Sequence, residues 1–239
     1  MQKNVEKMSI NYSPNFNTKK RSVSKVKYII FHYTGMKSEI GAIKKLTNKN
    51  SKVSCHYFIK ENGEIIRMIP DSYEAWHAGI SFWKKDNLLN SKSIGIEVSN
   101  PGHNHGYKDF NTKQVKSITK LTKFLKKKFQ IKKENILGHS DIAPLRKKDP
   151  GEKFPWRLLY KNQLCQWHNI SKRNCKKFRR IKLKNNKNFY KLLFKFGYKF
   201  TNNSTDKIKI LKSFQRRFRP ELISSIVDKE CYEILKSLI

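Results

Sequence analysis

Short apolar runs and helical repeats alternate along the first two thirds of the chain. Residues 28–31 and 94–98 are runs of β-forming side chains that predict buried strands, and residues 136–137 predict a further short one. Asn62-Gly63 lies between two more strand-like runs, which is a strong hairpin signal. Asn111-Thr112 followed by Gln114 resembles a helix start, and apolar residues recur with helical spacing over residues 115–129. This order predicts an α/β domain with a mixed central β-sheet flanked by helices.

The pattern changes on both sides of this domain. Residues 1–24 are polar and predict a flexible N-terminal arm, whereas residues 25–160 hold the α/β pattern. Residues 161–187 are basic and polar and predict a linker or a docking segment. Residues 188–239 return to helical spacing and predict a small all-α, three-helix C-terminal domain. No segment approaches the roughly 18 consecutive apolar residues of a membrane-spanning helix, which excludes an integral membrane protein.

The charge of the chain widens the range of possible partners. The 239 residues include 53 Lys and Arg against 18 Asp and Glu, a formal net charge of +35. Nucleic acid is one candidate partner for such a chain. The lysines are spread over nearly every segment and form no single stripe, so a solvated surface suited to any polyanion is the simpler interpretation. Nucleic acid therefore ranks low as the primary partner.

The N-terminus and the cysteines bear on the compartment. The first twenty residues contain no apolar stretch of the roughly 7–15 residues that a secretory leader needs. The four cysteines form no C-x-x-C pair, which favours reduced thiols. We expect a cytoplasmic protein, with a periplasmic location or secretion by an unconventional route as the alternative.

Three residues carry the side chains of a possible metal site. His32 ends an apolar run, His139 lies in Gly-His-Ser-Asp, and Asp149 lies in Lys-Asp-Pro-Gly. Two imidazoles and one carboxylate, with a fourth position open to water, form the ligand set of a hydrolytic zinc site. The two histidines are far apart in the chain, however, and a histidine at a strand end is more often packed or hydrogen-bonded than a ligand. The spacing alone leaves both interpretations open.

Four motifs resemble one enzyme family. They are YIIFHYTG from residue 28, AWHAG from residue 75, IGIEVSNPG from residue 94 and GHSDIAPLRKKDPGEKFPW from residue 138. Together they resemble the zinc-dependent N-acetylmuramoyl-L-alanine amidases of the AmpD/AmiD type, which are related to a phage lysozyme and to the peptidoglycan recognition proteins. The resemblance runs from about Lys25 to Tyr160. Residues 189–239 are similar to the peptidoglycan-binding-like domain of the AmiD branch.

The resemblance implies a role for each matching residue. His32, His139 and Asp149 would bind Zn²⁺, and Glu97 and Lys147 would be the catalytic base and cation. The segment Trp76, His77 and Ala78 would form the cleft wall that contacts the substrate. The implied reaction is hydrolysis of the amide bond between (anhydro-)N-acetylmuramic acid and L-alanine, in peptidoglycan or muropeptides. We expect the chain to be a monomer.

Plainer interpretations remain beside this one. Glu97 lies in a run predicted to be buried, where an unpaired carboxylate is costly without a purpose, but Lys147 has lysine and arginine neighbours that are typical of solvated surface. A non-catalytic peptidoglycan-binding module is the alternative function, and a basic nucleic-acid-binding protein ranks below it.

Overall fold

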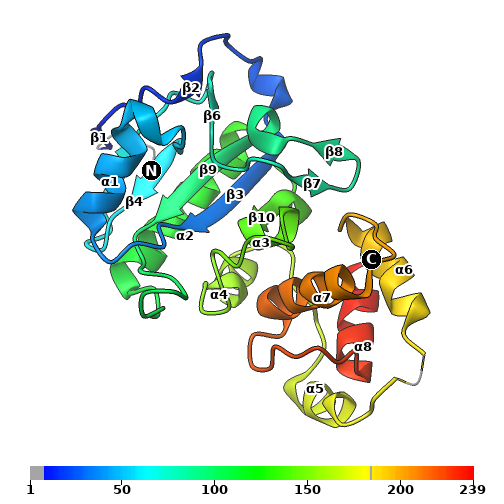
Figure 1. Cartoon of the computed structure of the whole chain (residues 1–239). Helices are drawn as coiled ribbons and strands as arrows, with labels where there is room; N and C mark the ends of the chain where they lie inside the picture. Colours follow the sequence, from blue (N-terminus) through cyan, green and yellow to red (C-terminus); the bar gives the residue numbers. More distant parts are fainter. Residues whose placement is uncertain (1–7, 184) are drawn as a thin grey trace.

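The computed structural model describes residues 8–183 and 185–239, and its centre is a six-stranded sheet with the order β1-β5-β4-β9-β3-β10 (Figure 1). Strands β10, β3, β9 and β4 are parallel neighbours, and β5 runs antiparallel to β4. The predicted mixed sheet is therefore confirmed. The strands are β1 (Ser9–Ile10), β2 (Phe16–Asn17), β3 (Tyr28–Tyr33), β4 (Tyr57–Ile59), β5 (Ile65–Arg67), β6 (Glu74–Ala75), β7 (Phe82–Trp83), β8 (Asp86–Asn87), β9 (Ser93–Val98) and β10 (Ile136–Gly138).

Helices cover the sheet and make up the C-terminal part of the chain. The α-helices are α1 (Glu39–Thr47), α2 (Thr112–Lys128), α3 (His139–Ile142), α4 (Trp156–Lys161), α5 (Lys172–Arg179), α6 (Lys187–Phe196), α7 (Ser204–Phe218) and α8 (Lys229–Leu238). Short 3-10 turns are η1 (Val23–Lys25), η2 (Lys49–Ser51), η3 (Leu89–Lys92) and η4 (Lys133–Asn135). None of the described helices is long and apolar enough to cross a membrane.

Alternate residues of β4 face different layers. Tyr57 and Ile59 belong to the main core together with α2, whereas Phe58 packs in a second cluster with Leu46 of α1. Side chains alternate across a strand, so α1 and α2 lie on opposite faces of the sheet. The sheet is consequently buried on both sides, as a largely parallel sheet requires.

Local signals in the sequence fix the predicted turns and helix starts. The Gly63 backbone has φ of 84°, a conformation that glycine adopts without strain, and β4 and β5 pair on either side of it. Helix α2 begins with a capping box. The Asn111 side chain accepts from the Gln114 backbone at 3.0 Å, and the Gln114 side chain accepts from the Asn111 backbone at 3.2 Å. The predicted hairpin and helix start are confirmed.

The N-terminal segment differs from the flexible arm predicted for residues 1–24. Its first seven residues lie outside the described residues, but β1 pairs with β5 and β2 pairs with β6. Arg21 is buried and donates to the carbonyl oxygens of Asp71 at 3.0 Å, Asn90 at 3.0 Å and Ser93 at 2.7 Å. Three buried carbonyl acceptors hold the segment, and its polar composition gave no sign of them.

The predicted linker at residues 161–187 is also partly ordered. It contains α5, whose Arg179 binds the buried carboxylate of Glu230 in α8 at 2.6 and 2.8 Å. Trp167 is buried in the core that the linker shares with both neighbouring regions. Contacts of this kind agree with the docking segment that the basic composition also allowed.

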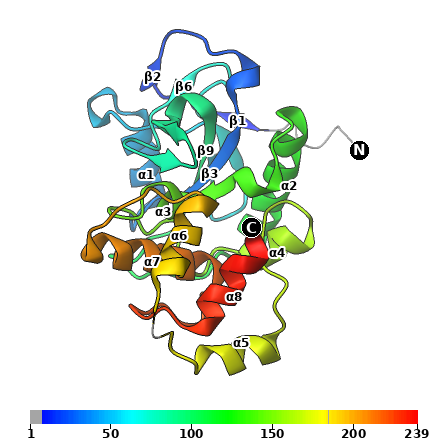
Figure 2. The same cartoon turned by 90° about the vertical axis from the view of Figure 1, so that its right-hand side faces the viewer.

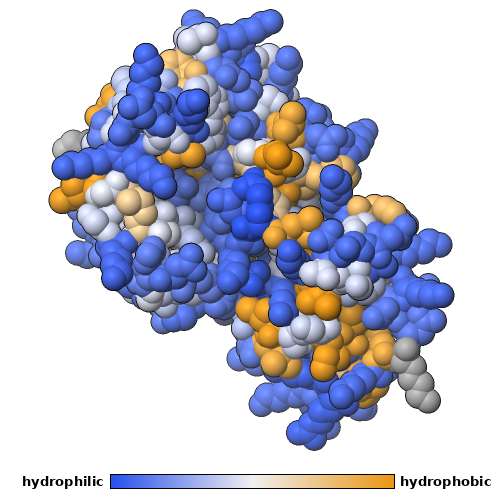
Figure 3. Space-filling view, in the orientation of Figure 1, coloured by the Kyte–Doolittle hydropathy of each residue, from blue (hydrophilic) through white to orange (hydrophobic). Residues whose placement is uncertain are grey.

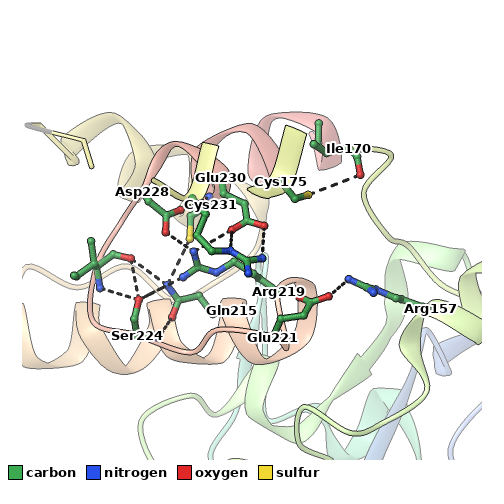
Figure 4. Close-up of polar contacts among 12 residues, drawn as sticks. Arg157, Ile170, Cys175, Gln215, Arg219, Glu221, Ser224, Asp228, Glu230 and Cys231 are labelled. Atoms are coloured by element: carbon green, nitrogen blue, oxygen red, sulfur yellow. Dashed lines mark hydrogen bonds and ion pairs between the residues drawn. The ribbon is translucent and has the colours of Figure 1, made fainter. Parts of the chain in front are cut away.

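The predicted C-terminal helices are present as α6, α7 and α8, and buried charges join α8 to the end of α7 and to α5. Figure 4 shows Arg219 between the carboxylates of Asp228 and Glu230. Arg179 also binds the Glu230 carboxylate. Asp228 also caps α8 by accepting from the Cys231 backbone at 2.9 Å. Each buried carboxylate therefore has a cation or a backbone donor.

The helical region packs directly against α3 (Figures 1 and 2). Arg217 of α7 forms a buried ion pair with Asp141, and Tyr198 donates to the same carboxylate at 3.1 Å. Ser213 donates to the Ser140 carbonyl oxygen at 2.6 Å. These contacts join the two regions through the helix that begins at His139. Hydrophilic side chains dominate the face in Figure 3, and apolar patches gather over the helical region.

Arg217→Met is expected to lower the free energy of unfolding by about 3–5 kcal/mol, because Asp141 would keep a buried charge without its cation. Denaturant unfolding of the purified chain measures this loss. Lys108→Met is the matched control. It breaks an exposed ion pair with Glu61 and is expected to cost less than about 1 kcal/mol. Equal losses in the two variants would contradict the assignment of a buried, structure-holding pair.

Candidate active site

Three adjacent parallel strands bring the predicted site residues together at their carboxyl ends. His32 lies near the end of β3, directly opposite Glu97 of β9, and β10 leads into His139 at the start of α3. Asp149 follows on a loop that is held by a 2.8 Å hydrogen bond from the Ser140 backbone to the Asp149 carbonyl oxygen. Crevices outside the carboxyl ends of such strands are the usual ligand sites of open α/β sheets. Here the cleft has a volume of about 440 Å³ and includes Lys147.

Two histidines and one aspartate converge in this cleft. The Nδ1 atoms of His32 and His139 are 2.9 Å apart, and Asp149 Oδ2 lies 3.1 Å from the first and 3.0 Å from the second. All three side chains are buried. A tetrahedral zinc site with bonds near 2.0–2.1 Å would separate its ligand atoms by about 3.3 Å. The triangle is therefore close to the dimensions of three such ligands, and the donor set fits the ion.

The far nitrogen of His139 shows which of its atoms carries the hydrogen. His139 Nε2 lies 3.2 Å from the Ala78 carbonyl oxygen, which can only accept, and 3.4 Å from Arg146 Nη2, which can only donate. The shorter contact, to the carbonyl oxygen, favours a hydrogen on Nε2. In the neutral imidazole, Nδ1 then points a lone pair at the Asp149 carboxylate. Two acceptors this close repel each other, so the space between them attracts a positive charge. A proton can bridge two atoms of the triangle formed by His32 Nδ1, His139 Nδ1 and Asp149 Oδ2, whereas a divalent cation can contact all three.

The charge state of His32 also suits a ligand. Burial, reinforced by the neighbouring His139, lowers the pKa of His32 to about 4. The imidazole is therefore neutral at pH 7 and can offer a lone pair to a cation.

The segment predicted to contact substrate has a different arrangement. Trp76 lies on the cleft and is partly exposed, as a substrate-contacting residue would be. His77 is only 9% exposed, and both ring nitrogens already have protein partners: His32 Nε2 at 3.0 Å and Ser93 Oγ at 3.1 Å. Ala78 is fully buried, and its carbonyl oxygen accepts from His139. His77 therefore lines the cleft beside Trp76 while its ring also contacts His32, whereas the buried Ala78 contacts His139 through its carbonyl oxygen.

Glu97 and Lys147 both line the cleft beside the histidines. Glu97 Oε2 is buried and has no hydrogen-bond partner among the described residues. Burial, followed by the negative charge of Asp149, raises the pKa of Glu97 well above its ordinary value, and Lys147 opposes the shift. A carboxyl group with a raised pKa and a free oxygen can hold a proton and release it. Lys147 is partly exposed and places a positive charge in the same space.

Sequence reasoning missed three residues around this site. Arg146 donates to the carbonyl oxygens of Ala78 and Ile80 and holds the loop behind His139. Ser93 contacts His77, and Gly95 lies against the His77 ring. A glycine inside an apolar strand often marks a close approach, so Gly95 carried a detectable signal, whereas Arg146 and Ser93 did not.

A second hollow, of about 950 Å³, is larger than the cleft but lacks its chemistry. It lies between the sheet and α6, and its lining is rich in lysine, with Asp86 and Glu134 as its acidic residues. Volume alone therefore does not identify the active site. The converging side chains of His32, His139 and Asp149 identify it.

Comparison with known proteins places the chain in a family. The model of the N-acetylmuramoyl-L-alanine amidase family matches residues 22–152. The chain is 31% identical to the N-acetylmuramoyl-L-alanine amidase AmiD of Escherichia coli over 231 residues, which cover 90% of this chain and 83% of that protein. It is 39% identical to the 1,6-anhydro-N-acetylmuramyl-L-alanine amidase AmpD of Haemophilus influenzae over 106 residues, 44% of this chain and 55% of AmpD.

Two solved structures cover nearly the whole chain. Escherichia coli AmiD in complex with anhydro-N-acetylmuramic acid-L-Ala-D-gamma-Glu-L-Lys matches with a TM-score of 0.80 and 30% identity, over 90% of this chain and 88% of that one. AmpDh3 of Pseudomonas aeruginosa in complex with anhydromuramic pentapeptide matches with a TM-score of 0.81 and 28% identity, over 96% and 97%.

A mixed sheet with two imidazoles and a carboxylate at the ends of its parallel strands has the architecture that metal-dependent hydrolases use. The family matches make the class specific: the chain belongs to the N-acetylmuramoyl-L-alanine amidase family, and it shares the AmiD arrangement over both of its regions. The predicted fold and family are confirmed.

In the metal-free protein, Glu97→Gln is expected to increase the free energy of unfolding at pH 7.5 by about 1–2 kcal/mol. The folded state raises the pKa of Glu97, so its ionisation opposes folding above the ordinary value of 4.5, and this cost disappears below that pH. Denaturant unfolding at pH 7.5 and at pH 4 therefore distinguishes the variant from the wild type only at the higher pH.

Glu64→Gln serves as the control for that measurement. Hydrogen bonds from Lys60 and Ser9 lower the pKa of Glu64, so its replacement should give no gain in stability at pH 7.5. A gain for Glu64→Gln, or none for Glu97→Gln, contradicts the assigned electrostatics.

Proposed function

We propose that the chain is a zinc-dependent amidase that hydrolyses the bond between anhydro-N-acetylmuramic acid and L-alanine in muropeptides. The observation that supports it most directly is the buried triangle of His32, His139 and Asp149 beside Glu97, whose buried Oε2 has no hydrogen-bond partner among the described residues. The anhydromuramyl peptides bound by AmiD and AmpDh3 support this substrate class.

Each residue of the cleft has a chemical task in this proposal. Zinc held by two imidazoles and a carboxylate supplies Lewis acidity, which activates water near neutral pH and polarises a carbonyl. Glu97 accepts a proton from the attacking water and delivers it to the nitrogen of L-alanine as the amide bond breaks. Lys147 places its charge near the carbonyl oxygen, which becomes negative as the tetrahedral centre forms. The products are a muramic carboxylate and a peptide with a free amino group.

Zinc-loaded chain incubated with anhydromuramyl tripeptide is expected to release free tripeptide, as measured by chromatography. Removal of the metal with a chelator should abolish release, and added Zn²⁺ should restore it. A chain that binds the muropeptide without releasing peptide is the binding module considered above, and this outcome refutes the proposal. Recovery by Mg²⁺ but not by Zn²⁺ would refute the choice of metal.

Glu97→Gln is expected to lower kcat about 10²–10⁴-fold, because the glutamine amide cannot accept and return the proton. Lys147→Met is expected to lower kcat about 10²–10³-fold through loss of transition-state charge stabilisation. Both variants should keep zinc, as metal analysis checks. Lys44→Met removes a charge from an exposed face of α1 and should retain wild-type kcat. If Glu97→Gln retains more than about a tenth of the wild-type kcat, Glu97 is not the base.

A further inference from the structure

A row of buried hydrogen-bonding groups connects the Leu89 carbonyl oxygen, through Ser93 and His77, to His32. Ser93 Oγ donates to the Leu89 carbonyl oxygen at 2.6 Å and lies 3.1 Å from His77 Nε2. His77 Nδ1 lies 3.0 Å from His32 Nε2. The other ring nitrogen of His32 belongs to the triangle with His139 and Asp149.

Ser93 determines which atom donates and which accepts in each hydrogen bond of this row. A hydroxyl has one hydrogen, and the Ser93 hydrogen is directed at the Leu89 carbonyl oxygen. Toward His77, therefore, the Ser93 oxygen can only accept. His77 Nε2 must carry a hydrogen and donate it.

The hydrogen on His77 Nε2 in turn determines the role of His77 Nδ1. His77 is buried, and its ring contacts are histidines, a serine and Gly95, with no carboxylate among them. A positive charge there would have no counterion, so the ring is neutral and carries a single hydrogen. With that hydrogen on Nε2, Nδ1 can only accept. His32 must then donate from Nε2, which leaves a lone pair on His32 Nδ1.

We propose that Ser93 and His77 are positioning residues, which fix His32 as the tautomer whose Nδ1 lone pair faces the metal site. The Ala78 carbonyl oxygen does the same for His139. Together they direct three acceptors at one point, and no hydrogen lies between those acceptors, an arrangement that requires a cation. The inference deepens the proposed zinc site and rests on it.

The packing around Gly95 leaves space for the His77 ring against β9. Gly95 lies within β9, where glycine weakens a strand. A Cβ at this position would lie 2.4 Å from His77 Cγ and 2.6 Å from His77 Nδ1. Any larger residue would displace the ring from its partners. The strand keeps its glycine because the imidazole occupies the space of the missing side chain.

Loss of the Ser93 hydroxyl removes the group that fixes the donor and acceptor roles of His77 and His32. In Ser93→Ala, His77 can carry its hydrogen on Nδ1, which forces His32 to accept at Nε2 and to carry its own hydrogen on Nδ1. Zinc must then displace that hydrogen. Losing such a supporting contact typically weakens metal binding by about 10–100-fold.

The first test needs no variant. In the metal-free full chain, ¹⁵N NMR of the histidine rings should show hydrogen on Nε2 of both His32 and His77. Hydrogen on His32 Nδ1 in the wild type overturns the proposal. Because NMR reads the tautomer directly, the result does not depend on muropeptide hydrolysis.

The second test compares zinc affinity by competition with a chromogenic chelator. Ser93→Ala and Gly95→Ala are expected to raise the zinc Kd about 10–100-fold, with His32 shifting toward the Nδ1–H form in Ser93→Ala. Ser93→Thr keeps a hydroxyl and should recover most of the affinity. Ser99→Ala removes another buried hydroxyl next to the same strand and should bind zinc like the wild type.

The outcomes separate this inference from the proposed function. If Ser93→Ala binds zinc as tightly as the wild type with an unchanged His32 tautomer, Ser93 has no positioning role, whatever the enzyme hydrolyses. If zinc binding depends on Ser93 but the loaded wild type releases no peptide, the positioning role holds and the amidase proposal fails.

Discussion

The molecule holds three hydrogen-bond acceptors about 3 Å apart inside the protein, and much of the structure maintains that arrangement. His32, His139 and Asp149 repel one another when no cation or proton lies between them, so a flexible scaffold would let them separate. They instead come from two paired parallel strands and a loop pinned to the start of α3. Rigid elements of this kind keep a metal site preorganised, because ligands that cannot relax need little reordering when an ion binds.

The C-terminal helical region contributes to this rigidity. Arg217, Tyr198 and Ser213 reach the first turn of α3, the turn that begins with His139. Whatever ligand this region binds, its contacts with Asp141 and Ser140 brace one of the metal-site histidines. The helical region is therefore part of the scaffold, in keeping with a single main core that includes residues of both regions. The structures of AmiD and AmpDh3 match the chain across both regions.

The sequence predicted the sheet, the hairpin and the helix starts because each has a local cause: an apolar run, an Asn-Gly turn, a capping side chain. It also predicted the residues of the triangle, through motifs that keep them in register. The ordered N-terminal segment was missed because Arg21 is fixed by carbonyls of distant residues, which leave no trace in local composition. The role of His77 was missed for a related reason. Its ring donates to the Ser93 oxygen, and only the fold places that hydroxyl beside it.

The cleft combines several features that cost stability. Glu97 keeps a buried oxygen without a partner, β9 carries a glycine in its middle, and three acceptors face one another. Each feature opposes folding, whereas the buried carboxylates Asp141, Asp228 and Glu230 all have cations. Several local conflicts that gather in one cleft are typical of functional sites. The same conflicts have a chemical use. An unpartnered carboxyl can move a proton, and facing acceptors bind a cation, so the features that cost stability are those that amide hydrolysis needs.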